Sequence, residues 1–120
     1  MTIIYQTQFT KVGDYARDAL GEGMLITFKQ GAPADLEDYC FIHSHGELST
    51  ALQVGDVVEF DGMAYPITAV GDVASFNLKE LGHATWRFDG AANAEYPGTI
   101  HVVGDVPSAV KEGSVLCIRR

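Results

Sequence analysis

Two histidines separated by a single residue make residues 40–48 the segment richest in chemistry. On a β-strand successive side chains alternate between faces, so His43 and His45 would share one face, and Gly46 would end the strand. Neutral imidazole is a good nucleophile near pH 7, because its unperturbed pKa is about 6.5. The spacing therefore suits a reactive site in which one ring nitrogen accepts a transferred group while the other is held by a hydrogen bond.

The same spacing also suits a metal ion. A His-x-His pair on a strand can chelate zinc, iron or manganese if a third ligand is supplied, and His83 and His101 are the candidates. The pattern resembles that of the cupins, although Glu47 follows His45 more closely than the cupin pattern requires. Two strand histidines without a catalytic role are a third interpretation. From the residues alone, His43 and His45 are equivalent, and the metal interpretation stands slightly ahead.

Short apolar segments, separated by glycines, predict the elements that position these histidines. Strands are expected at residues 1–10, 24–28, 39–45, 57–60, 65–70, 83–88, 98–103 and 114–118. Asp61-Gly62 favours a tight hairpin turn, and the best helix signal covers residues 73–82, with Gly82 placed to end it. The sequence thus predicts one all-β domain over residues 1–120, a small closed or partly open β-barrel with one or two short helices.

The charge of the chain excludes some classes of function. A net charge of -8, with eight scattered basic residues, does not suit nucleic-acid binding and favours a basic protein partner. No apolar run approaches the roughly 20 residues that cross a bilayer, and residues 1–6 lack the features of a signal peptide. We therefore expect a cytoplasmic protein without membrane insertion, in which Cys40 and Cys117 are reduced and mostly buried.

Residues 31–48 closely resemble the IIA component of the glucitol/sorbitol phosphotransferase system. The likeness begins near residue 2 and spans nearly the whole chain, continuing through residues 65–71, 77–83, 87–90, 95–102 and 113–116. Long matched segments in a fixed order are far more specific than a single His-x-His pair.

The resemblance implies a function, partners and site residues. Family members take a phosphoryl group from the phosphorylated carrier protein HPr, hold it on one histidine and pass it to a cysteine of the IIB domain of the IIB/IIC sugar transporter. The phosphorylated histidine of the family falls on His43, and His45 is left a supporting role. His83 and His101 also match family positions but receive no assigned role. The scheme requires no metal and no other cofactor, and a regulator that kept the fold is a further possibility.

The apolar neighbours of His43 have two interpretations. An apolar ring around His43 would allow HPr and the IIB domain to use the same face in turn, through small and transient contacts. Phe41, Ile42 and Leu48 are the candidates for such contacts. Membership of the hydrophobic core is an equally good interpretation of each.

Overall fold

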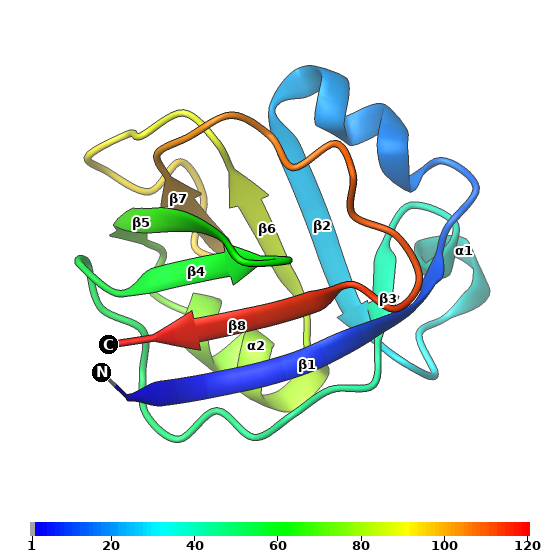
Figure 1. Ribbon diagram of the computed structural model, residues 1–120, viewed down its shortest axis with the longest axis horizontal. Helices are drawn as coiled ribbons and strands as arrows, with labels where there is room; N and C mark the ends of the chain where they lie inside the picture. The colour runs from blue at the N-terminus through cyan, green and yellow to red at the C-terminus, as the bar shows by residue number, and fades with distance from the viewer. Residues whose placement is uncertain (1) are drawn as a thin grey trace.

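Eight strands close into a barrel in the computed structural model, which describes residues 2–120 (Figure 1). Around the barrel the strands follow the order β1-β3-β2-β6-β7-β5-β4-β8, and the β2–β3 and β6–β7 pairs are parallel. The strands are β1 (Ile3–Val12), β2 (Met24–Lys29), β3 (Phe41–His43), β4 (Val57–Phe60), β5 (Met63–Val70), β6 (Ala84–Arg87), β7 (Thr99–Val102) and β8 (Val115–Arg119). The predicted β-barrel is confirmed, and it is closed.

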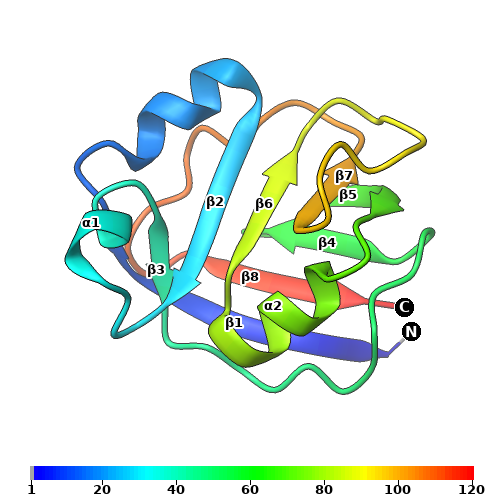
Figure 2. The same cartoon turned by 180° about the vertical axis from the view of Figure 1, so that it is seen from behind.

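In the part of the chain that the structure describes, three short helices accompany the strands. They are the 3-10 helix η1 (Ala16–Glu22) and the α-helices α1 (Ala34–Glu37) and α2 (Ala74–Leu81). Figure 2 shows α2 beside the start of β6, against which it packs. Gly82 ends α2 in the left-handed conformation, at φ 60°, as the sequence predicts. Among residues 2–120, no helix is long and apolar enough to cross a membrane.

The alternation of buried and exposed residues explains the barrel. In β5, Tyr65 and Ile67 are buried whereas Pro66 is exposed, which is the period-two pattern of a strand with one face in a core. The rings of Phe60 and Trp86 pack edge to face inside the barrel, with their centroids 5.8 Å apart. The core also contains buried histidines, and these are the polar side chains of chemical interest.

The hairpin between β4 and β5 follows from its two turn residues. Asp61 and Gly62 adopt φ angles of 52° and 82°. Positive φ at both central residues is the geometry that matches the twist of the flanking strands. The predicted hairpin turn at this dipeptide is confirmed.

Residues 39–45 differ from the prediction. The strand is shorter than expected, because β3 ends at His43 and His45 takes a left-handed φ of 68°. Phe41, Ile42 and Leu48 are all buried. Of their two interpretations the core is therefore correct, and the expected apolar contact ring of these three residues is wrong.

Candidate functional site

His43 lies inside the barrel wall, between two neighbouring strands. It pairs with Phe9 of antiparallel β1 on one side and with Lys29 of parallel β2 on the other. Its side chain is fully buried, at 0% exposure. A buried polar side chain must find hydrogen-bond partners within the protein, so its neighbours determine its chemical state.

Both ring nitrogens of His43 have partners. Nδ1 accepts the backbone N–H of His45 at 3.1 Å and also lies 3.1 Å from the Thr7 hydroxyl oxygen. Nε2 lies 2.8 Å from the carbonyl oxygen of Gly82. Because a backbone N–H can only donate, Nδ1 must be unprotonated, and Nε2 therefore carries the ring proton and donates it to Gly82. The surroundings thus select one tautomer.

Burial also fixes the charge of this imidazole. It lowers the pKa of His43 from 6.5 to about 4, because the charged form loses its hydration, and nearby His45 lowers it further. The hydrogen bond to the carbonyl of Gly82 acts in the opposite direction but is the smaller effect. His43 is therefore neutral at pH 7, which is the form of histidine that acts as a nucleophile.

The ring of His45 lies beside that of His43, as predicted, but a turn and not strand alternation places it there. Since β3 ends at His43, strand alternation does not extend to His45, and the left-handed turn places its ring 5.8 Å from that of His43, centroid to centroid. Its Nδ1 accepts the hydroxyl of buried Tyr5 at 2.8 Å, and its Nε2 donates to the carbonyl oxygen of Lys79 at 2.9 Å. The ring of His45 therefore links β1, through Tyr5, to α2, through Lys79.

The last turn of α2 is the common partner of these side chains. The final carbonyl groups of a helix have no partner within the helix and carry its partial negative charge. His45 donates to the carbonyl of Lys79, Lys29 to that of Glu80 at 3.1 Å, and His43 to that of Gly82. The three donors therefore fasten the end of α2 over the buried imidazole.

Gly82 makes this close approach to the ring possible. A Cβ atom on Gly82 would lie 2.6 Å from Cε1 and 2.8 Å from Nε2 of His43, closer than real Cβ atoms approach other atoms. Glycine is therefore required here both for its positive φ and for space. The sequence showed Gly82 only as the end of a helix, and it gave no sign that Lys29 belongs to the site.

The two remaining histidines lie elsewhere. His83 stacks on Phe28 with ring centroids 5.0 Å apart. Buried His101 pairs through Nδ1 with Asp89 at 2.8 Å, and its Nε2 accepts the backbone N–H of Glu95 at 3.0 Å. His101 thus stabilises the loop before β7.

The positions of the four histidines bear on the metal alternative. Within residues 2–120, no three His, Cys, Asp or Glu side chains are gathered so as to hold a metal ion. The third ligand that a cupin-like site on His43 and His45 requires is therefore absent from this part of the chain. The geometry of these residues thus gives the metal alternative no support. The fold and the site together define a small β-barrel protein with a buried, neutral histidine of fixed tautomer.

Comparison with known proteins assigns that barrel to a family. The family model of the PTS system glucitol/sorbitol-specific IIA component matches residues 4–117. Two relatives, the PTS system glucitol/sorbitol-specific EIIA components of Shigella flexneri and Escherichia coli (strain K12), are each 60% identical over 116 residues, covering 97% of this chain and 94% of theirs. The crystal structure of a PTS system IIA component from Enterococcus faecalis V583 has a TM-score of 0.84 and 27% identity, covering 92% of this chain and 96% of that one.

The chain therefore belongs to the family of PTS glucitol/sorbitol-specific IIA components. It is a phosphoryl carrier of the sugar phosphotransferase system and in that sense a phosphotransferase component. The resemblance found in the sequence is confirmed. Its partners are other components of that system.

Proposed function

We propose that His43 is the residue that carries the phosphoryl group. It takes the group from phosphorylated HPr and passes it to the cysteine of the IIB domain of the glucitol/sorbitol IIB/IIC transporter. The observation that carries this proposal is the state of the His43 ring, which is neutral and has one tautomer selected by the hydrogen bonds of both nitrogens. A carrier histidine needs both properties, because the attacking nitrogen must be uncharged and correctly oriented.

His45 has a supporting role in this proposal. Its backbone N–H holds Nδ1 of His43, and its ring holds the end of α2 through the carbonyl of Lys79. Tyr5 fixes the ring from the other side. These contacts suit a residue that positions its neighbour more than one that reacts.

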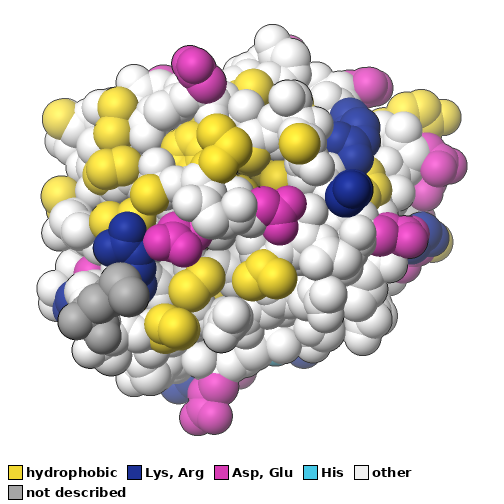
Figure 3. Space-filling model, in the orientation of Figure 1, with side chains coloured by type: hydrophobic (Ala, Val, Ile, Leu, Met, Phe, Trp, Pro, Cys, Tyr) yellow, Lys and Arg dark blue, Asp and Glu magenta, His cyan; other side chains and the backbone are white. Residues whose placement is uncertain are grey.

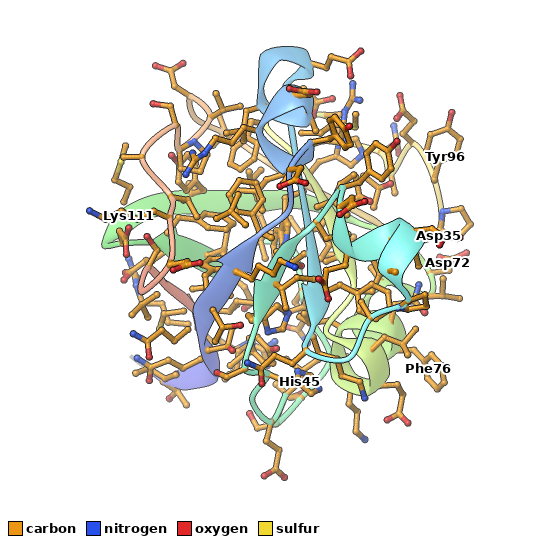
Figure 4. All side chains as sticks on the ribbon, turned by 90° about the vertical axis from the view of Figure 1, so that its right-hand side faces the viewer. Asp35, His45, Asp72, Phe76, Tyr96 and Lys111 are labelled. Carbon is orange, nitrogen blue, oxygen red and sulfur yellow. The ribbon has the colours of Figure 1, made fainter. Side chains whose placement is uncertain are left out.

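The burial of His43 adds a requirement to the proposal. Phosphoryl transfer proceeds with the donor and acceptor atoms in line, so the donor must reach a nitrogen that is now covered. Gly82 is the residue whose backbone lies against Nε2. We infer that the corner between α2 and β6 moves away from His43 when a partner docks. Figure 4 shows His45 at one end of the molecule, and this is the end at which the partner would bind.

A cytoplasmic location for both transfers is part of the proposal. Cys40 and Cys117 are both free thiols, as is usual in the reducing cytoplasm. Burial raises the pKa of Cys40 to about 11, so this cysteine is a poor acceptor of phosphoryl groups beside the neutral imidazole.

Labelling with phosphorylated HPr tests the proposal. The wild-type chain is expected to gain one phosphate that is labile in acid and stable in base, and His43→Ala is expected to gain none. His45→Ala is the matched control and should still be labelled, at a lower rate. Full labelling of His43→Ala would refute the assignment, and circular dichroism of both variants would verify that each is folded.

A further inference from the structure

Lys29 is a cation that borders the site. It is the register partner of His43 in the parallel β2–β3 pair, and its Nζ donates to the carbonyl of Glu80 at 3.1 Å. A Cβ atom on Gly82 would lie 2.8 Å from Nε2 of His43 and 3.0 Å from Cβ of Lys29. Both side chains therefore border the same corner, and Nε2 is the ring nitrogen on the side of Lys29.

Lys29 also differs from half of the basic residues of this acidic chain. Lys11, Arg119 and Arg120 form ion pairs with carboxylates, and Arg87 lies 3.9 Å from two of them. Figure 3 shows acidic and basic side chains interspersed on one face of the molecule. Within residues 2–120, Lys29 forms no ion pair and only donates to a carbonyl oxygen. Its charge is thus held in place without being neutralised.

We propose that Lys29 binds the phosphoryl group on Nε2 of His43, which makes it a second residue of the transfer site. This inference rests on the proposed function of His43. In the step, the bond between phosphorus and Nε2 forms as the bond between phosphorus and the donor imidazole of HPr breaks. Before this step the ring proton moves from Nε2 to Nδ1, where the Thr7 hydroxyl oxygen at 3.1 Å can accept it, because only an unprotonated ring nitrogen has a lone pair for phosphorus. The electron pair of the broken bond stays on the donor nitrogen, which becomes the unprotonated nitrogen of a neutral imidazole.

Access to the ring favours Nε2 for this step. Nδ1 lies against the hydroxyl of Thr7 in β1 and the backbone N–H of His45, whereas Nε2 lies against the carbonyl of Gly82. Movement of the corner between α2 and β6 therefore exposes Nε2. Once the ring proton has moved to Nδ1, the Thr7 hydroxyl accepts it in place of the bond from His45.

Electrostatics explains why a cation is required there. A phosphoryl group on Nε2 would face the carbonyl end of α2, whose partial negative charge repels it. The ammonium group of Lys29 already lies on the carbonyl of Glu80, two residues from Gly82. By exchanging that carbonyl for a phosphoryl oxygen, Lys29 would offset the repulsion with a charge-assisted hydrogen bond. Lys79 lies on the same helix, but within residues 2–120 its ammonium group has no contact that directs it to His43.

The equilibrium of phosphoryl exchange with HPr tests this role. Equal amounts of the full chain and phosphorylated HPr are mixed, and the phosphorylated fraction of each is measured at equilibrium. Lys29→Met is expected to shift the equilibrium constant about tenfold toward phosphorylated HPr, the size of one charge-assisted hydrogen bond. Lys29→Arg should restore most of the wild-type value. A defect in docking alone would slow both directions and leave the equilibrium unchanged.

The matched control is Lys111→Met, which removes one charge from an exposed lysine well away from His45 (Figure 4). It should leave the equilibrium at the wild-type value. An unchanged equilibrium in Lys29→Met, or an equal shift in Lys111→Met, would overturn the role of Lys29 and leave the proposed function standing. A wild-type chain that took no phosphate on His43 would overturn both.

Discussion

Acidification from pH 7 to pH 5 should destabilise the fold through His43. The pKa of His43 is about 4 in the fold and 6.5 in the unfolded chain, so between these values the unfolded chain binds a proton that the fold excludes. The contribution of neutral His43 to the free energy of unfolding is therefore fully present above pH 6.5, and it is lost as the pH falls toward 4. The difference between the two pKa values of His43 corresponds to about 3 kcal/mol of free energy of unfolding, of which about 2 kcal/mol is lost by pH 5.

Urea unfolding of the wild type and of His43→Gln at both pH values measures this loss. Glutamine does not titrate, and its amide can donate to the carbonyl of Gly82 in place of Nε2. The wild type should lose about 2 kcal/mol more than the variant on going from pH 7 to pH 5. Burial lowers the pKa of His83 as well, but that contribution is present in both proteins and cancels. Equal losses in the two proteins would refute the claim that His43 is kept neutral by burial.

Two further predictions concern the contacts around the ring. Gly82→Ala should destabilise the fold by about 2–4 kcal/mol, the sum of left-handed strain and overpacking against His43, and should slow phosphoryl uptake. Gly23→Ala is its control, because Gly23 has a φ of 77° but open space around it, and equal losses in urea unfolding would contradict the clash. Tyr5→Phe should cost about 1 kcal/mol by removing the hydrogen bond to His45, while the variant still takes up phosphate in the HPr assay.

Much of the barrel could be predicted from local sequence. Each expected strand overlaps an observed one, because glycines delimit the apolar segments and side chains alternate along them. The turn at Asp61-Gly62 and the helix end at Gly82 follow from residues that tolerate positive φ. The strand order could not be predicted, because the parallel pairing of β2 with β3 and of β6 with β7 depends on long-range packing. The assignment of residues 1–120 to one domain stays a prediction.

The site was only partly accessible from the sequence. The spacing of His43 and His45 indicated reactive chemistry, yet strand periodicity gave the wrong reason for their proximity, which depends on the left-handed turn at His45. The contacts of His43 depend on segments far apart in the chain, because Lys29 lies in β2 and Gly82 at the end of α2, more than 30 residues beyond His43. No pattern local to residues 40–48 contains that information.

The location of the phosphoryl group tests the central claim most directly. The wild-type chain is phosphorylated by HPr, digested at alkaline pH and sequenced by tandem mass spectrometry with a fragmentation method that preserves the bond between nitrogen and phosphorus. We predict that the phosphate lies on His43 in every phosphorylated peptide. Phosphate on His45, His83 or His101 with His43 unmodified would contradict the account.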